Sequence, residues 1–265
     1  MMSSVFMKSL WDQRKSLIWW GLGCAVLIIV TILFYPSVSD TPELNELLGD
    51  ETSIARVFVG DISDMTSPEG YLNSQLYYLM IPLLFLVFAI SRGSGAIAGE
   101  EESGTLDLLL SNPQPRSKIV LHKFAALAVA LTMFGIVLWL SAVVGSVFVD
   151  MDISFVKLGE VTLSAAFLGA TFGALALMLS CATGKRNLSI GVASAMGVAT
   201  YFLNALLPLV DALEPLTRLS PFYYYIDADP LTNGLSILHA LVLACLSGSM
   251  LIVALITFDR RDLAV

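Results

Sequence analysis

The chain has 265 residues, of which 57% are hydrophobic and only 14% are charged, and its formal net charge is −8. Soluble globular proteins carry about a quarter charged residues, so this composition excludes an ordinary soluble domain and indicates an integral membrane protein. A bilayer core about 30 Å thick needs about 20 apolar residues at a rise of 1.5 Å each, so the hydrophobic runs can be counted as helical spans.

Six such runs predict an all-α integral membrane protein with six transmembrane helices, and we interpret residues 1–265 as a single transmembrane domain. The predicted spans are residues 17–35, 71–91, 119–149, 161–183, 188–210 and 236–258, with external segments at 36–70 and 211–235. Eleven of the 14 Lys and Arg residues fall on the side that holds both termini. Because Lys and Arg mark the cytoplasmic side, we expect both termini to be cytoplasmic.

The first 16 residues have the pattern of a helix that precedes the first span. Met2, Phe6 and Leu10 recur at intervals of four, and Trp11 favours the headgroup level of a membrane. A helix with such an apolar stripe lies in the plane of the interface, so residues 1–16 predict an interfacial elbow helix. The alternative is a cytoplasmic extension of the first span. That span exceeds the apolar region of a typical secretory signal, so we interpret it as retained.

The polar segment at residues 97–116, between the second and third spans, combines three acids with an apolar turn. Acids in a first turn suit the positive end of the helix dipole, so the glutamates at 100–102 predict the start of a helix. Pro113 lacks the N–H that a continuing helix needs, which limits the helix to two to three turns, from Glu100 to Ser111. The charge pattern alone fits an amphipathic helix on the membrane surface and a solvated loop equally well.

The run Gly99-Glu100-Glu101-Glu102-Ser103-Gly104-Thr105-Leu106, with the two leucines, the proline and the arginine that follow, resembles the first cytoplasmic loop of permease subunits of type-2 ATP-binding-cassette (ABC) transporters. In that family this loop is the coupling helix, which docks into a groove on the ATPase. The resemblance extends to residues 10–20, 67–73 and 260–263. It implies that coupling to the ATPase involves Glu100, Glu101, Glu102, Gly104, Thr105, Leu106, Leu109, Leu110, Pro113 and Arg116.

The resemblance further implies a permease of an ATP-driven exporter in the cytoplasmic (inner) membrane of a prokaryote. Its partners would be two copies of a cytoplasmic ATP-binding subunit and a second permease copy or a related permease, within the lipid bilayer and without nucleic acid. ATP and Mg would bind to the ATPase, and this chain would bind no cofactor or metal. Lipid, drug and peptide-like substrates remain open. The alternative is a non-transporting membrane scaffold or sensor that recruits a cytoplasmic partner.

Several motifs of energy-coupled or enzymatic membrane proteins are missing from the sequence. Gly184-Lys185 is followed by arginine and lacks the earlier glycine of a phosphate-binding loop. No predicted span has an acid, Lys or Arg near its centre, which argues against an ion-coupled transporter. The glutamates lack the arginine of the Glu-Glu-x-x-x-Arg pattern of membrane proteases, and two histidines cannot form a three-histidine zinc site. We therefore expect no enzyme, and the energy for transport must come from a separate subunit.

Small residues recur at intervals of four in two predicted spans. Gly169 and Gly173 lie in the fourth span, and Gly191 and Ala195 lie in the fifth. Small residues at this spacing let helix backbones approach each other closely in a membrane. We expect them to pack helices within the chain, and a contact between subunits is the alternative.

Overall fold

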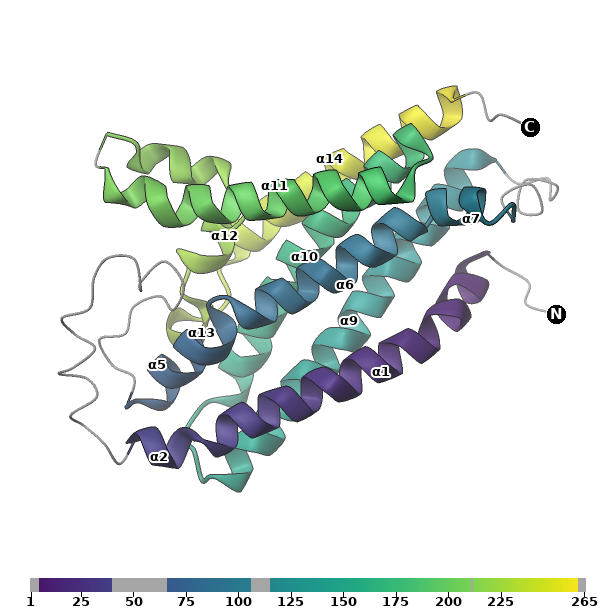
Figure 1. Ribbon diagram of the computed structural model, residues 1–265. Coiled ribbons are helices and arrows are strands. Elements are labelled where there is room, and N and C mark those ends of the chain that lie inside the picture. The colour runs from purple at the N-terminus through teal and green to yellow at the C-terminus, as the bar shows by residue number, and fades with distance from the viewer. Residues whose placement is uncertain (1–4, 40–65, 106–114, 211, 262–265) are drawn as a thin grey trace.

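The computed structural model describes residues 5–39, 66–105, 115–210 and 212–261, and every regular element in these ranges is a helix (Figure 1). Six helical segments within them are long and apolar enough to cross a membrane, which confirms the predicted all-α architecture with six candidate spans. These segments are Arg14–Ser39, Pro68–Gly95, Arg116–Phe148, Phe155–Thr183, Arg186–Leu209 and Ile237–Arg260.

The first long helix, α1, runs unbroken from Val5 to Leu33, and the short helix α2 (Tyr35–Ser39) follows it. Residues 5–16 form the beginning of α1, so the structure does not confirm the predicted elbow helix at residues 1–16 as a separate helix. Residues 5–20 contain no proline or glycine, so nothing in the backbone chemistry ends the helix before the first span. With 29 residues α1 is about 44 Å long, which exceeds a hydrocarbon core of about 30 Å.

The second span consists of α5 (Pro68–Leu72), a π-helical turn η1 (Asn73–Tyr77) and α6 (Met80–Gly95). The interruption lies just before Pro82, which has no N–H for a helical hydrogen bond. Side chains from other elements hold this interruption in place. The Tyr77 carbonyl accepts a hydrogen bond of 2.5 Å from the Tyr225 hydroxyl, and the Tyr77 hydroxyl lies 3.3 Å from that of Thr162.

The remaining long helices are α9 (Arg116–Phe148), α10 (Phe155–Thr183), α11 (Arg186–Leu206) and α14 (Ile237–Arg260). Between α11 and α14 the chain forms the short helices η2 (Leu207–Leu209), η3 (Glu214–Leu219), α12 (Tyr223–Ile226) and α13 (Pro230–Asn233). The helix α7 (Ala98–Glu102) follows α6. Figure 1 shows α7 at the same end of the bundle as the beginning of α1 and the end of α14, with α2, α5 and α13 at the opposite end.

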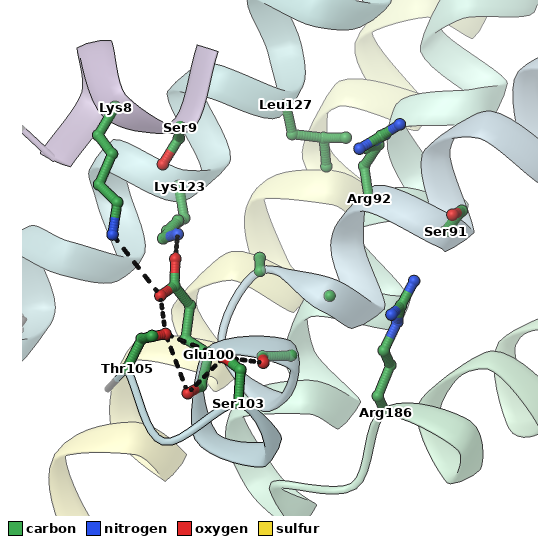
Figure 2. Close-up of a pocket in the computed structure, with 13 residues that line it drawn as sticks. Lys8, Ser9, Ser91, Arg92, Glu100, Ser103, Thr105, Lys123, Leu127 and Arg186 are labelled. Atoms are coloured by element: carbon green, nitrogen blue, oxygen red, sulfur yellow. Dashed lines mark hydrogen bonds and ion pairs between the residues drawn. The ribbon is translucent and has the colours of Figure 1, made fainter. Parts of the chain in front are cut away.

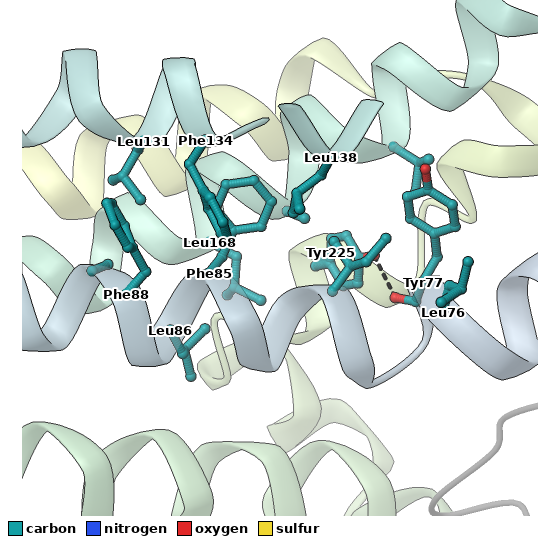
Figure 3. Close-up of a cluster of buried hydrophobic side chains, with 14 of the residues drawn as sticks. Leu76, Tyr77, Phe85, Leu86, Phe88, Leu131, Phe134, Leu138, Leu168 and Tyr225 are labelled. Carbon is teal, nitrogen blue, oxygen red and sulfur yellow. Dashed lines mark hydrogen bonds between the residues drawn. The ribbon is translucent and has the colours of Figure 1, made fainter. Parts of the chain in front are cut away.

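The helix α10 is the centre of the bundle, because it packs against α6, α9, α11 and α14. In its apolar window 67% of the residues are buried, against 22% for each of the windows in α1, α11 and α14. These three outer helices therefore present most of their apolar side chains outward. The core beneath them is rich in aromatic rings (Figure 3): Phe134 lies edge-on to Phe85, with ring centroids 5.2 Å apart, and stacks on Phe88 at 4.8 Å.

The small residues of the fourth and fifth spans have different surroundings. A Cβ atom added to Gly169 would lie 2.9 Å from the Cβ of Phe85, and one on Gly173 would lie 3.1 Å from the Cβ of Ala89. Both glycines thus face α6, where α10 approaches it closely. In α11, Gly191 and Ala195 are exposed, and no atom of the described residues lies within 4 Å of a Cβ position at Gly191. A contact between subunits at these two residues stays a prediction.

Candidate functional site

The three consecutive glutamates lie in α7, a helix of five residues. The helix ends at Glu102, and Gly104, two residues later, adopts the left-handed conformation with φ of +67°. The single helix predicted from Glu100 to Ser111 is therefore wrong, because this glycine turns the backbone out of the helical direction. The predicted coupling residues Leu106, Leu109, Leu110 and Pro113 lie outside the described residues.

Glu100 forms the innermost contacts of α7, and its side chain is only 14% exposed. It accepts hydrogen bonds from the Lys123 ammonium at 2.8 Å and from the Thr105 hydroxyl at 2.5 Å, and the Lys8 ammonium lies 3.9 Å away (Figure 2). Burial raises the pKa of Glu100, but these hydrogen bonds and the charges of both lysines outweigh it and lower the pKa below its ordinary value of 4.5. Glu100 is therefore held as a carboxylate between α1 and α9.

Glu101 joins α7 to the end of α14. One of its oxygens accepts a hydrogen bond of 2.5 Å from the guanidinium of Arg261, which also donates to the carbonyl of Cys181 at 3.5 Å. Gly184, in the turn after α10, lies beside this pair with φ of +63°, and a Cβ atom there would overlap the Arg261 guanidinium. The pair therefore depends on glycine in this turn.

Glu102 binds the beginning of α11. One oxygen of its carboxylate accepts a hydrogen bond of 2.9 Å from the backbone N–H of Arg186, the first residue of that helix. The first N–H groups of a helix have no partner within it, and they form the positive end of its dipole. The carboxylate therefore satisfies one of these donors and places a negative charge where the dipole favours it.

Neutral hydrogen bonds complete the attachment of α7. The N–H of Ala98 donates to the hydroxyl of Ser180 in α10 at 2.8 Å, and this hydroxyl donates to the carbonyl of Ser94 in α6 at 3.0 Å. Together with those of the glutamates, these contacts bond α7 to α1, α9, α10, α11 and α14. The remaining long helix, α6, directly precedes α7 along the chain. The contacts of α7 therefore reach all six candidate spans.

Arg116, a predicted coupling residue, is the first residue of α9 and binds the end of α14. Its guanidinium donates to the carbonyl of Arg261 at 2.8 Å and to that of Phe258 at 3.4 Å. The last carbonyls of a helix lack partners within the helix, so this arginine acts as a C-terminal cap. The predicted coupling residues that the structure describes thus have three kinds of role. The three glutamates and Thr105 bond α7 to its neighbours, Gly104 ends α7, and Arg116 joins α9 to α14.

Sequence reasoning missed the basic partners of the glutamates. Lys8, Lys123 and Arg261 were assigned to the cytoplasmic side by the charge distribution, but no local motif links them to the acids. The available signal was general: eleven of the 14 Lys and Arg residues were predicted on the side that carries the three glutamates. Among the described residues, no three His, Cys, Asp or Glu side chains gather in an arrangement that could hold a metal ion.

A family model and one curated protein match this chain over different lengths. The family described as "ABC-2 family transporter protein" matches residues 3–263. A curated protein of Stutzerimonas stutzeri, "Probable ABC transporter permease protein NosY", is 32% identical over 136 residues. The match spans 49% of this chain and 46% of that protein, so about half the length of this curated relative is covered.

Proposed function

Because the chain belongs to the ABC-2 family of transporter proteins, we propose that it is the membrane-spanning permease subunit of an ATP-driven exporter. A separate subunit binds ATP and Mg²⁺ and docks at the end of the bundle that carries α7. The observation that carries this proposal is the bonding of the five-residue helix α7 to every candidate span. The proposed membrane is the cytoplasmic membrane of a prokaryote, with both termini on the cytoplasmic side.

The contacts of α7 suit a part that transmits force. Charge-assisted hydrogen bonds are shorter and stronger than neutral ones, and each glutamate makes its bond to a different helix. A push on α7 from a closing ATPase dimer would move α9, α11 and α14 together rather than bend one loop. Packed helices shift between discrete arrangements, so a small displacement at α7 can change the path through the membrane.

Two copies of the chain, or this chain with a related permease, would pair with two ATPases in the proposed complex. The apolar outer faces of α1, α11 and α14 face lipid or another membrane helix, since only 22% of each apolar window is buried within the chain. Gly191 and Ala195 would let a helix of the second copy approach α11 closely.

Affinity purification of the tagged chain from its native host in mild detergent tests the proposal. We expect an ATPase with a phosphate-binding loop to co-purify, as identified by mass spectrometry and by ATP hydrolysis. The variant Leu106→Asp with Leu109→Asp changes two predicted docking residues, and it should lose the ATPase. Leu213→Asp with Leu216→Asp, at exposed sites in the connection between α11 and α14, is the matched control and should keep it.

Each outcome of this purification supports or overturns the proposal. Loss of the ATPase only in the Leu106→Asp, Leu109→Asp variant, with normal membrane insertion, supports docking beside α7. Recovery of the wild type without any ATPase, under conditions that keep membrane complexes intact, contradicts the transporter proposal and favours a scaffold or sensor. Equal recovery from all three proteins would place the docking surface elsewhere.

A further inference from the structure

A pocket of about 400 Å³ opens beside α7, between α1, α6, α9 and α11 (Figure 2). Its charged lining residues are Lys8, Arg92, Lys123, Arg186 and Glu100, so four cations share the pocket with a single carboxylate. Glu100 is already bonded to Lys123 and lies near Lys8. Figure 2 shows both arginines on the side of the pocket away from this cluster.

No ion pair joins the side chain of either arginine to another described residue. The Nε atom of Arg92 is buried without a hydrogen-bond partner, and its guanidinium lies over the ring of Phe88 at 5.6 Å. Arg186 binds Glu102 through its backbone N–H only. The Arg186 side chain passes close to the backbone of Gly95, where an added Cβ atom would lie 3.6 Å from the arginine Nε. The positive charges of the two arginines repel each other. Burying a hydrogen-bond donor without a partner, beside a second positive charge, costs free energy of folding. A bound anion would offset this cost by accepting the hydrogen bond and neutralising the charges.

An apolar cavity of about 540 Å³ adjoins this pocket between α6 and α11, and Ser91 lines both. It is lined by Leu83, Val87 and Ile90 from α6 and by Ile190, Val198 and Phe202 from α11. Along α6 it reaches from Ser91 to Leu79, which is about 18 Å at 1.5 Å per residue. One leaflet of a hydrocarbon core about 30 Å thick is about 15 Å deep, so the cavity matches the depth of one leaflet.

We propose that the two cavities form one binding site for an anionic amphiphile of the phospholipid type. The phosphate would bind the guanidinium groups of Arg92 and Arg186, whose planar donors match phosphate oxygens. The acyl chain would lie in the apolar cavity between α6 and α11. This inference rests on the proposed function only where it names such an amphiphile as the class of transported substrate; the binding itself does not depend on an ATPase.

Direct binding to the purified chain in neutral detergent, measured by native mass spectrometry, tests the site. The probes are dioleoyl phosphatidic acid, dioleoylglycerol, which has the same chains without the phosphate, and inorganic phosphate, which has no chain. We expect phosphatidic acid to bind most tightly. The variant Arg92→Gln with Arg186→Gln should weaken its binding about tenfold or more, since loss of one charge-assisted hydrogen bond is worth about that factor.

Two further variants separate the phosphate contact from net charge and from the acyl chain. Lys118→Gln with Lys185→Gln removes two exposed cations outside the pocket and should bind phosphatidic acid like the wild type. Ser194→Phe fills the apolar cavity and should weaken binding of phosphatidic acid but not of inorganic phosphate. Arg92→Lys with Arg186→Lys keeps the charge without the planar donors and should bind with intermediate affinity. Thermal unfolding of each variant shows whether it is folded.

Three results would overturn the inference. Unchanged phosphatidic acid binding in the folded Arg92→Gln, Arg186→Gln variant removes the phosphate contact. Equal affinity for inorganic phosphate and phosphatidic acid, with no effect of Ser194→Phe, indicates a site for free anions. If the Arg92→Gln, Arg186→Gln variant loses a co-purifying ATPase but still binds phosphatidic acid like the wild type, the arginines bind an acidic partner protein. Lipid binding in a chain that recruits no ATPase would contradict the proposed transport function and leave the binding site standing.

Discussion

Glu101 accepts a hydrogen bond of 2.5 Å from Arg261, although 160 positions separate the two residues along the chain. The same guanidinium donates to the carbonyl of Cys181 at the end of α10. One arginine therefore holds α7, α10 and the end of α14 together. Because its partner is a carboxylate of the proposed coupling element, changes at this pair should affect both the stability of the bundle and the docking of an ATPase.

A double-mutant cycle on Glu101→Gln and Arg261→Gln measures how strongly the pair is coupled. The side chains are 27% and 19% exposed, so water screens the pair only in part. We expect a coupling energy on the order of 1 kcal/mol, with the double variant little less stable than the weaker single variant. Unfolding of the purified protein in mixed detergent micelles gives the four free energies. Strictly additive losses would show that the two residues act independently.

Gly184→Ala should destabilise the protein more than Gly104→Ala. Both glycines adopt left-handed backbone conformations, with φ of +63° and +67°, where a side chain costs roughly 1 kcal/mol. At Gly184 the new methyl would also overlap the Arg261 guanidinium, whereas nothing among the described residues lies within 4 Å at Gly104. The difference in unfolding free energy between the two variants therefore measures the cost of the overlap between the new methyl and Arg261. Equal losses would mean that Arg261 moves aside without cost.

The spans could be predicted because the bilayer sets a coarse length that long apolar runs must meet. The fourth span shows the limit of this signal, since α10 begins at Phe155 and not at residue 161. Lys157 and Glu160 interrupted the apolar run, but a charged side chain does not end a helix near the membrane surface. Glu160 accepts a hydrogen bond from the backbone N–H of Leu235 at 3.1 Å, which the sequence pattern could not show.

The candidate site was only partly predictable from the sequence. The resemblance to a transporter loop located the glutamates, but their contacts depend on helices that are distant along the chain. The end of α7 had a local signal in Gly104, because glycine commonly terminates helices. The three acids, as the first turn of a longer helix, predict a later end, and the structure follows the glycine. The continuous helix α1 had no such signal, since residues 5–20 lack a breaker and an apolar stripe fits both interpretations.

Gly93→Ala should be among the more harmful single-methyl changes in the membrane part of the bundle. A Cβ atom at Gly93 would overlap the backbone carbonyl of Gly173, and two backbones cannot move apart as easily as flexible side chains. We expect a loss of about 1–3 kcal/mol in unfolding free energy. Gly23→Ala, in α1, is the control because no described atom lies within 4 Å of its Cβ position. Similar stability of the two variants would contradict the close contact between α6 and α10.

The stability contributed by Glu100 should depend on pH. Its pKa in the folded protein lies below the ordinary value of 4.5, because the hydrogen bonds from Lys123 and Thr105 and the charges of both lysines outweigh burial. The ionised form therefore contributes stability that is fully present above about pH 4.5 and is lost as the pH falls through the lower folded pKa. Glu100→Gln removes this titration while keeping the size of the side chain.

The difference in unfolding free energy between the wild type and Glu100→Gln should accordingly be largest at pH 7. It should shrink as the pH falls below 4.5, because the protonated wild-type side chain then resembles the amide. Glu214→Gln, at an exposed position of η3, is the control and should show a small difference at every pH. A difference for Glu100→Gln that stays constant from pH 7 to pH 3 would mean that the side chain acts through its shape and not through its charge. In that case the lysines of α1 and α9 would not be the groups that hold α7 in place.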